Sequence, residues 1–244
     1  MMNKHYIVQD KELIFRNPLE VYRGLILNKK IQKWHEFISN QYLPPYGKSL
    51  ILFYPCSAVK PYTLSRTYRT LFRTLSNFGE KRKLIHVITV SEPFALVPEE
   101  YYNRKTEWYD WENDWYECPG LFEWWCRRNK TNYDKKYADM CIDILSNVIA
   151  RFLKRVKLNE EFKSLRLMGF VRTYSSSLKV TYNNTHRILL EEASKKSQVK
   201  LLLLPTRKFI ANLIRKRGRA AWDFYGISHP LMQQYLFVKI KQLL

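Results

Sequence analysis

Glycine, cysteine and long apolar runs are all scarce in this sequence, and each scarcity excludes a class of protein. Only 7 of the 244 residues are glycine, and no stretch is rich enough in glycine and serine to form a flexible linker. No apolar run reaches the length of about 18 residues that a membrane span needs, and the N-terminal sequence MMNKHYIVQDKELIF lacks the apolar centre of a secretory signal. The sequence therefore favours a single domain over residues 1–244, located in the cytoplasm and without a membrane partner.

The few cysteines also argue against two kinds of structural site. The 4 cysteines include no Cys-x-x-Cys pair, and histidine is scarce near them, so we expect neither a zinc site nor any other metal site. Without a secretory signal, a disulfide framework is not expected either. We expect no cofactor, and we interpret three of the cysteines as small buried apolar residues, namely Cys118, Cys126 and Cys141.

Positive charge is what the sequence has in excess. It contains 42 Lys and Arg against 22 Asp and Glu, which gives a net charge of +20 and a pI near 9.8. Such a field attracts polyanions and speeds their association, although it does not determine a fold. Because no segment spans a membrane, the charge favours nucleic acid as the partner.

The order of apolar and amphipathic segments predicts an α/β fold. Short apolar runs typical of strands buried on both faces occur at 49–55, 83–90, 164–171 and 199–205. Helical spacing of apolar residues occurs at 18–42, 65–78, 132–156, 183–196 and 229–244. We therefore expect a mostly parallel four-stranded sheet with helices on both faces, and a ligand site beyond the carboxyl ends of its strands.

The segment FYPCSAVKPYTLSRTY, residues 53–68, follows the first predicted strand and groups several reactive side chains. Lys60 and the helix that begins near Ser65 would both favour the thiolate form of Cys56, which is the reactive form. Ser57 and Tyr62 could hold a polar ligand beside it. In the alternative interpretation, Ser65 only caps the helix and Lys60 is solvated.

The same segment resembles the first motif of the archaeosine synthase core catalytic domain. That motif is Pro-Cys, three residues, Lys-Pro-Tyr, two residues, Ser, two residues and His. This chain has Pro55-Cys56, Lys60-Pro61-Tyr62 and Ser65 at the matching positions, and Tyr68 replaces the histidine. The later segments ITVSEPFALVPEE and Tyr109-Asp110 are also similar to the family. The resemblance covers about residues 30–244 and leaves 1–30 as an N-terminal extension.

The resemblance implies a fold and an activity. The fold is a three-layer α/β/α sandwich like that of uracil-DNA glycosylases. Archaeosine synthases act on 7-cyano-7-deazaguanine already placed in the D-arm of tRNA, and they add the ε-amine of free lysine to its nitrile; the family was earlier described as an amidinotransferase. The partners implied are tRNA, free lysine and a separate radical enzyme that acts on the lysine adduct. This chain would be an archaeal tRNA-modifying transferase.

The resemblance and the residue chemistry together give candidate roles. We expect the catalytic residues to be Cys56, Lys60, Tyr62, Ser65 and Tyr68. We expect the substrate-binding residues to be Ser57, Glu92 and Asp110. Cys56 either adds covalently to the nitrile or only positions it, and Tyr62 or Lys60 would protonate the nitrile nitrogen. Tyr68 can donate a hydrogen bond but is not a base near neutral pH.

Residues 99–117 break the basic composition, because they hold seven acidic residues among Trp and Tyr. They could shape an amino-acid pocket through Asp110, form a surface for a partner, or be a loop that packs its tryptophans inward. We interpret His86, in the second predicted strand, as a core histidine.

Two basic clusters are candidates for contact with tRNA phosphates. The predicted tRNA-binding residues are Arg66, Arg69, Arg73, Arg215, Lys216, Arg217 and Arg219. For the second cluster the alternative is a solvated helix end that complements the helix dipole.

Two rival functions remain open at this stage. One is a non-catalytic tRNA-binding subunit of the same fold, which the replacement of the motif histidine by Tyr68 makes credible. The other is a nucleobase glycosylase, which only fold analogy suggests.

Overall fold

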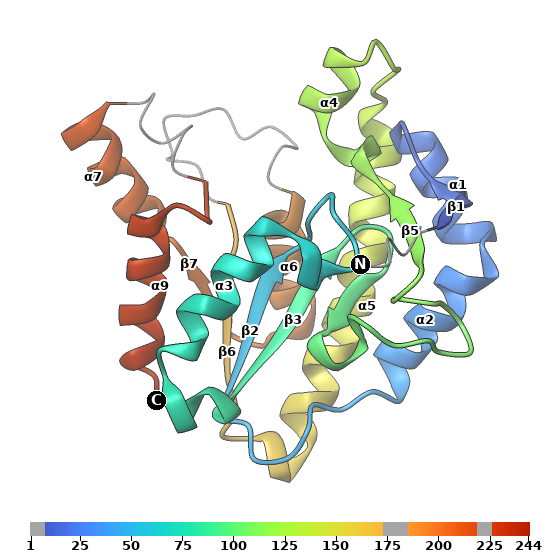
Figure 1. Cartoon of the computed structure of the whole chain (residues 1–244). Coiled ribbons are helices and arrows are strands. Elements are labelled where there is room, and N and C mark those ends of the chain that lie inside the picture. The colour runs from blue at the N-terminus through green and yellow to red at the C-terminus, as the bar shows by residue number, and fades with distance from the viewer. Residues whose placement is uncertain (1–7, 173–184, 219–225) are drawn as a thin grey trace, which may run out of the picture.

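The centre of the protein is a five-stranded sheet with the strand order β4-β3-β2-β6-β7 (Figure 1). A computed structural model describes residues 8–172, 185–218 and 226–244. The strands are β2 (Leu50–Pro55), β3 (Ile85–Ser91), β4 (Ala95–Pro98), β6 (Arg166–Phe170) and β7 (Leu202–Leu204). All neighbouring strands run parallel except β4, which is antiparallel to β3. The expectation of a mostly parallel sheet in an α/β fold is confirmed.

The predicted number of four strands in this sheet was wrong. The fifth strand, β4, lies in the sequence SEPFALVP, which follows the strand predicted at 83–90 and was not predicted to form a strand itself. A turn over residues 92–94 reverses the chain, so that Ala95 pairs with Ser91 and Pro98 with Ile88. The apolar residues of β4 are fully buried, and this burial makes a short strand of what looked like a loop.

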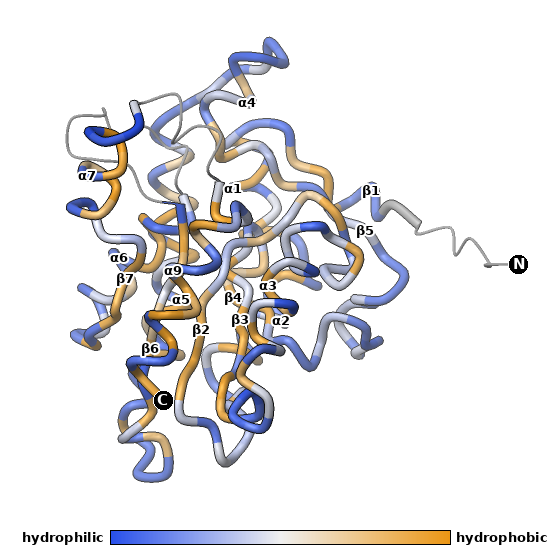
Figure 2. Tube along the Cα trace, turned by 60° about the vertical axis from the view of Figure 1, so that its left-hand side comes forward, coloured by the Kyte–Doolittle hydropathy of each residue, from blue (hydrophilic) through white to orange (hydrophobic). Residues whose placement is uncertain are grey.

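Helices cover both faces of the sheet (Figure 1). Helices α3 (Arg66–Ser76) and α9 (Pro230–Lys241) lie on one face, while α5 (Lys135–Leu158) and α6 (Thr185–Ser197) lie on the other. Because both faces are covered, every residue of β2 and β3 is buried. Figure 2 shows the central strands as the hydrophobic part of the chain.

Side-chain caps fix where several helices begin. Ser65 accepts a hydrogen bond from the Thr67 amide and starts α3, and Asp134 does the same for α5 through the amide of Lys136. The single helix predicted over 18–42 is two helices, α1 (Pro18–Leu27) and α2 (Lys29–Asn40). Asn28 separates them because its side chain accepts from the Ile31 amide and caps α2.

Residues 8–27 pack into the body of the protein. Strand β1 (Val8–Ile14) pairs in parallel with β5 (Asp114–Glu117) in a second, two-stranded sheet, and α1 packs against α5. Leu13 and Val21 are fully buried. Gly120 sits so close to the backbone of Asn17 that a Cβ there would come within 2.7 Å of its nitrogen. These residues, which we expected to be an extension, thus form part of the core.

The acidic aromatic stretch 99–117 packs its rings inward. Tyr109 and Trp111 are 3% exposed and Tyr116 is fully buried. The ring centroid of Trp111 lies 4.7 Å from that of Trp34 on α2. Of the three interpretations of this stretch, the one that agrees with its packing is a loop whose aromatic rings point into the core.

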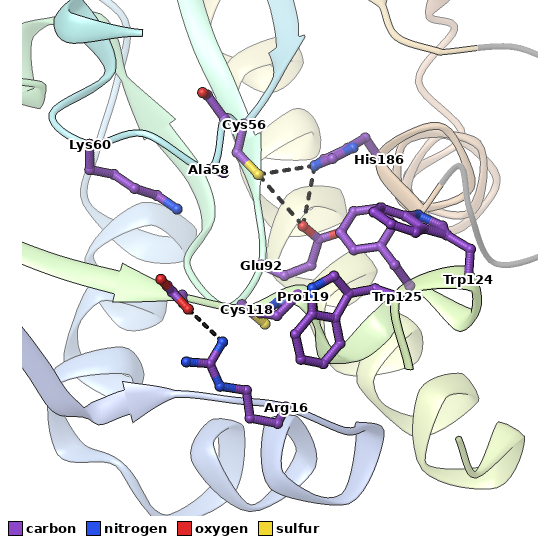
Figure 3. A pocket seen from close by; sticks show the side chains of 13 residues that line it. Arg16, Cys56, Ala58, Lys60, Glu92, Cys118, Pro119, Trp124, Trp125 and His186 are labelled. Carbon is purple, nitrogen blue, oxygen red and sulfur yellow. Dashed lines mark hydrogen bonds and ion pairs between the residues drawn. The ribbon is translucent and has the colours of Figure 1, made fainter. Parts of the chain in front are cut away.

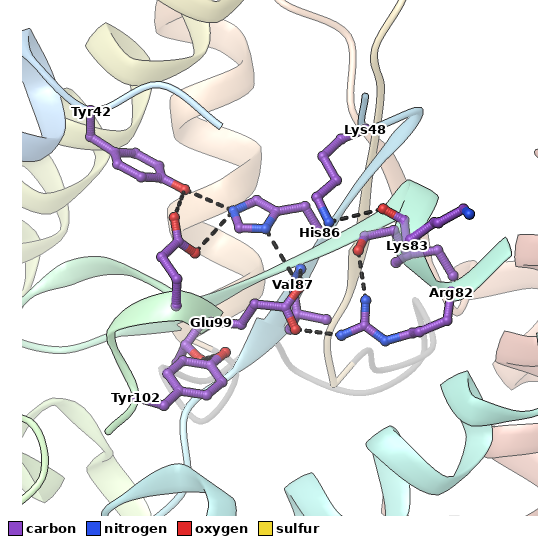
Figure 4. A network of polar contacts seen from close by, with 11 residues as sticks. Tyr42, Lys48, Arg82, Lys83, His86, Val87, Glu99 and Tyr102 are labelled. Atoms are coloured by element: carbon purple, nitrogen blue, oxygen red, sulfur yellow. Dashed lines mark hydrogen bonds and ion pairs between the residues drawn. The ribbon is translucent and has the colours of Figure 1, made fainter. Parts of the chain in front are cut away.

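His86 lies in a buried polar network at the amino end of β3 (Figure 4). Its Nε2 is 2.7 Å from the Tyr42 hydroxyl, and Glu99 and Glu100 lie within 3.6 Å of its ring nitrogens. The opposite end of β3 carries the site described below. The interpretation of His86 as a core histidine agrees with this position.

In the described ranges, no helix is both long and apolar enough to cross a membrane.

Candidate active site

A cavity of about 340 Å³ opens beyond the carboxyl ends of β2 and β3 (Figure 3). Parallel strands bring the residues that follow them to one edge of the sheet, which is where ligands bind in this architecture. Cys56 follows β2 and Glu92 follows β3, and His186 is in the first turn of α6. The cavity is lined by Arg16, Cys56, Ser57, Ala58, Lys60, Glu92, Glu117, Cys118, Pro119, Phe122, Trp124, Trp125 and His186.

Cys56, His186 and Glu92 form a compact polar cluster (Figure 3). The Sγ of Cys56 lies 3.3 Å from Nε2 of His186 and 3.9 Å from Oε2 of Glu92. The same Nε2 is 3.2 Å from Glu92 Oε2, so one ring nitrogen faces both the sulfur and the carboxylate. In sequence, Cys56 is 36 residues from Glu92 and 130 residues from His186.

The electrostatics of the cluster favour a charged histidine beside an ionised carboxylate. Burial lowers the pKa of His186, but the charges of Glu92 and Cys56 and the hydrogen bonds to them raise it, with a net result well above 6.5. Burial raises the pKa of Glu92, but the charge of His186 and its hydrogen bond bring it below 4.5. These charges therefore favour the imidazolium form of His186, which can donate a proton next to the sulfur.

The same three side chains form a possible metal-binding set. Their ligand atoms all lie within 4.8 Å of one another, and Cys, His and Glu are donors that Zn²⁺ accepts. Three protein ligands leave a fourth position open, as catalytic zinc sites do. Sequence reasoning missed this set, because its members are not close in the sequence.

Hydrogen bonds from Ser57, Ser65 and Tyr68 hold the loop that carries Cys56. Ser57 and Ser65 share a hydrogen bond of 2.7 Å, and the Ser57 hydroxyl also accepts from the Val59 amide. The Tyr68 hydroxyl donates to the carbonyl of Pro55 at 3.1 Å, immediately before Cys56. Tyr68 is fully buried and lies outside the cavity, so its contact with this loop goes through the backbone.

Lys60 enters the cavity, whereas Tyr62 lies beside it. Lys60 is 6% exposed, and its Nζ lies 4.2 Å from the centroid of the Tyr116 ring. Burial lowers the pKa of Lys60 despite the nearby acidic groups. Tyr62 is buried, hydrogen-bonded to Ser91 and Tyr116, and does not line the cavity. Lys60 thus has direct access to a ligand, and Tyr62 does not.

The outer wall of the cavity is aromatic and comes from the first turn of α4 (Glu123–Arg128) and from Phe122, which precedes it. Phe122, Trp124 and Trp125 line it, and the Phe122 ring centroid is 5.9 Å from that of His186. Arg16 forms a 2.5 Å ion pair with Glu117, and its guanidinium carbon lies 5.7 Å from the Trp125 ring centroid. This wall was not predicted.

The predicted substrate residues divide between two places. Ser57 and Glu92 line the cavity with Cys56, whereas Asp110 does not. The Asp110 carboxylate accepts from the amides of Glu112 and Asn113 and so closes a local turn. The Asp110 carboxylate is thus occupied by hydrogen bonds within its own loop, away from the cavity.

The predicted tRNA-binding residues lie on exposed helix surfaces. Arg66, Arg69 and Arg73 are exposed along α3. Arg215, Lys216 and Arg217 are exposed in the last turn of α7 (Arg207–Arg217), which Gly218 ends. Helix α9 lies beside both, contacting α3 directly and α7 through a Phe209–Tyr235 stack of 4.1 Å. Arg219 lies outside the described residues.

Comparisons with known proteins give partial matches. Residues 31–113 match the model of a domain of unknown function, DUF5591. The chain is 28% identical over 101 residues to archaeosine synthase subunit alpha of Thermococcus kodakarensis, which covers 41% of this chain and 17% of that protein. It is 33% identical over 68 residues to the same subunit of Thermoplasma acidophilum, covering 28% and 12% of the two chains. The matched region thus spans less than a fifth of each of these curated relatives.

One solved structure is also similar in part. It is the crystal structure of AF0587, a protein of unknown function, with a TM-score of 0.37 and 16% identity over 77% of this chain and 49% of the other.

Proposed function

We propose that this protein is a tRNA-modifying transferase of archaeosine biosynthesis, which adds free lysine to the nitrile of 7-cyano-7-deazaguanine in tRNA. The observation that carries the proposal is the position of Cys56 Sγ, 3.3 Å from Nε2 of a charged His186, in a cavity at the carboxyl edge of the sheet. Cys56 belongs to the segment that resembles the archaeosine synthase motif and lies within the DUF5591 match. The similarity to archaeosine synthase alpha subunits supports the choice of tRNA as substrate.

The charge distribution supports a nucleobase rather than a phosphate inside the cavity. Although the chain carries +20, most of the charged side chains that line the cavity are paired, His186 with Glu92 and Arg16 with Glu117, and Lys60 is a further basic side chain whose pKa is lowered by burial. Phe122, Trp124 and Trp125 offer flat surfaces on which a base that leaves the RNA stack can lie. The phosphates would then contact the exposed basic residues of α3 and α7.

The first chemical step forms a bond between Cys56 and the nitrile carbon. As the Cys56 thiolate attacks this carbon, the carbon–nitrogen triple bond becomes a double bond, and the nitrile nitrogen takes a proton from His186. The product is a thioimidate bound to Cys56. Glu92 stabilises the imidazolium before transfer, because it lies 3.2 Å from the same ring nitrogen. His186 thus takes the acid role that sequence reasoning gave to Tyr62 or Lys60.

The second step transfers the carbon to lysine. The neutral ε-amine adds to the thioimidate carbon, the carbon–sulfur bond breaks, and Cys56 leaves as a thiolate. The proton that the amine loses returns to His186. One N–H bond has been added across the nitrile to give an amidine, and no oxidant or reductant is needed. Lys60, with its lowered pKa, can accept the proton that free lysine must lose before it attacks, and can return it to the amidine, which then leaves as an amidinium.

The test is to incubate the protein with free lysine and tRNA that carries the nitrile base, and to analyse the nucleosides by mass spectrometry. We expect the mass of the nitrile nucleoside to rise by that of one lysine. Binding of tRNA without any mass change would contradict transfer and favour a non-catalytic subunit. Release of the free base would favour a glycosylase. If the lysine adduct forms, it is the substrate expected for a separate radical enzyme.

A further inference from the structure

We propose that Arg16 and Glu117 together bind the α-carboxylate and the α-ammonium of the free amino acid that this site uses. The inference rests on the proposed function, because it names the subsite of the second substrate. Both side chains line the cavity that holds Cys56, and they belong to different segments of the chain; Figure 3 shows Arg16 at this cavity. Arg16 follows β1, and Glu117 is the last residue of β5.

The pair is held in place but keeps free binding capacity. Only Nη1 of Arg16 contacts Glu117, at 2.5 Å, and the guanidinium also lies beside the Trp125 ring. The Arg16 side chain is 40% exposed and that of Glu117 is 28% exposed, so both reach solvent in the cavity. A guanidinium has five N–H donors in a planar fork and binds carboxylates bidentately. Arg16 can therefore bind a carboxylate while Glu117 still holds it.

The α-carboxylate and α-ammonium of an amino acid are complementary in charge to Arg16 and Glu117, respectively. An amino acid carries its carboxylate and its ammonium on one carbon, so a guanidinium next to a carboxylate can neutralise both charges at once. The adjacent Cys118 and Pro119 line the cavity next to Glu117 and leave a mainly apolar path for an aliphatic side chain. A lysine bound in this way extends its ε-amine away from the pair, toward the part of the cavity that Lys60 and Cys56 line.

A phosphate fits the pair less well than a zwitterion does. Glu117 would repel a phosphate placed on Arg16, whereas it attracts an ammonium. Among the described residues, the remaining basic side chain of the cavity without an acidic hydrogen-bond partner is Lys60, and burial lowers its pKa and so disfavours its charged form. The cavity therefore lacks the excess of positive charge that phosphate binding needs.

The test measures binding by calorimetry, with and without tRNA carrying the nitrile base, so that its outcome does not depend on transfer. The probes are lysine, norleucine, cadaverine and 6-aminohexanoate. Norleucine keeps both α-groups, cadaverine lacks the carboxylate, and 6-aminohexanoate lacks the α-ammonium. We expect norleucine to compete with lysine, and the other two to bind about tenfold or more weakly, because each loses a charge-assisted contact.

Two variants assign each charge to its residue. Arg16→Gln should weaken lysine about tenfold or more and leave cadaverine unchanged, because cadaverine has no carboxylate to lose. Glu117→Gln should weaken lysine similarly and leave 6-aminohexanoate unchanged. Unchanged binding of these probes also shows that the variants are folded. The matched control is Arg127→Gln, which removes an exposed ion pair with Glu123 on α4 and should change nothing.

Failure of the amino-acid subsite and failure of lysine transfer give different results in these experiments. Equal losses for every probe, or no loss for lysine, would overturn the pair as the amino-acid subsite, even where transfer proceeds. Norleucine binding that depends on Arg16 and Glu117 would support the subsite, even where no lysine is transferred to tRNA. Inorganic phosphate that displaces norleucine and binds more tightly to Glu117→Gln would make the pair an anion site and overturn the proposal. Lysine that binds under neither condition would overturn it as well.

Discussion

At the scale of single residues, the surroundings of Cys56 distinguish it from the other thiols. Cys56 is partly exposed to the cavity, whereas Cys118, Cys126 and Cys141 are buried. Burial raises the pKa of the Cys141 thiol to about 12 and also raises those of Cys118 and Cys126. A buried thiol with a raised pKa is a poor nucleophile near neutral pH. Among the described residues, Cys56 is therefore the thiol that we propose as the nucleophile.

The first prediction concerns lysine transfer by Cys56→Ala. We expect transfer to fall by at least about a thousandfold if the covalent route operates, because the methyl group of alanine cannot form the thioimidate. Cys141→Ala is the control and should retain transfer. Nucleoside mass spectrometry provides the readout. Full transfer by Cys56→Ala would rule out the covalent route, and transfer lost on chelation and restored by Zn²⁺ would reassign Cys56, Glu92 and His186 to a metal site.

The second prediction concerns stability and pH, and it follows from the raised pKa of His186. The folded pKa lies above the ordinary value of 6.5, so the contribution of the charged ring to stability is complete below about pH 6.5 and is lost as the pH rises through the raised pKa. The difference in unfolding free energy between wild type and His186→Gln should therefore shrink above pH 6.5. Its slope should be at most about 1.4 kcal/mol per pH unit for one proton.

Denaturant unfolding at a series of pH values gives this difference. Glu92 acts in the opposite direction: its lowered pKa means that its contribution is present above about pH 4.5 and is lost as the pH falls through the lowered value. A difference that is constant from pH 6 to pH 9 would contradict a charged His186.

How much of this site the sequence reveals depends on the distance between its parts. Cys56 and Glu92 were predictable because each follows an apolar run, and parallel strands bring such positions together. His186 was not, because its place depends on how α6 packs against the rest of the chain. One sequence signal existed, since His186 lies in the first turn of the helix predicted over 183–196, but many helices have polar residues in their first turn. Asp110 shows the converse: a carboxylate in a turn is satisfied by nearby amides.

At the scale of elements, the Ser65 hydroxyl at the start of α3 makes two contacts with different roles. Ser65 caps the helix through the Thr67 amide and holds Ser57 in the Cys56 loop. The two interpretations of Ser65, as a cap and as a member of the site, are therefore compatible. Ser65 reaches the cavity only through Ser57, which makes it a positioning residue.

The third prediction compares two helix caps. Ser65→Ala and Asp134→Ala should each lower the unfolding free energy by about 1 kcal/mol, since each removes a side-chain acceptor at a helix start. Only Ser65→Ala should also lower the rate of lysine transfer, because only Ser65 holds the Cys56 loop. Thermal unfolding and initial transfer rates provide the two readouts. Equal transfer rates in the two variants would show that the Ser57–Ser65 contact does not position the site.

The fourth prediction concerns the basic end of α7. Replacing Arg215, Lys216 and Arg217 by Gln should weaken tRNA binding and flatten its log–log salt dependence by about two to three units, if each side chain contacts one phosphate. Affinity measured at several salt concentrations tests this.

The matched control removes the same number of charges from the other side of the molecule. Arg23, Lys29 and Lys33 are exposed on α1 and α2, which lie far from α7 in Figure 1. Their replacement by Gln should change the slope much less. Equal slopes for both triple variants would mean that the α7 cluster is a solvated helix end, and that tRNA binding depends on the overall charge.

At the scale of the whole molecule, the first segment of the chain belongs to the same core as the sheet. Leu13 on β1 and Val21 on α1 are fully buried, and α1 packs on α5. The sequence resemblance began only near residue 30, so it gave no reason to expect this packing. The apolar spacing of the α1 region did predict a helix, but a helical pattern alone does not show what the helix packs against.

The fifth prediction uses this shared core. Leu13→Ala should lower the unfolding free energy of the whole chain by about 2–5 kcal/mol, since it leaves a cavity in the core. The exposed neighbour Glu12→Ala should change it by less than about 0.5 kcal/mol. We expect one cooperative transition in both variants, measured by circular dichroism and by tryptophan fluorescence. Two separate transitions in Leu13→Ala would show that residues 8–27 fold independently of the sheet.

The packing of Gly120 against Asn17 has a consequence for how this cavity can diversify. Cys56, Lys60 and Glu92 lie within the segment matched by the family model, whereas Arg16, Glu117 and His186 lie outside it. Under the proposed function, the sulfur nucleophile and the subsite of its second substrate are thus encoded in separate stretches. The bare backbone contact between Gly120 and Asn17 joins the segment that carries Arg16 to the segment that carries Glu117, both outside the family match, without any specific side chain. A relative could keep the first stretch, exchange the second, and couple the same electrophile to a different amine.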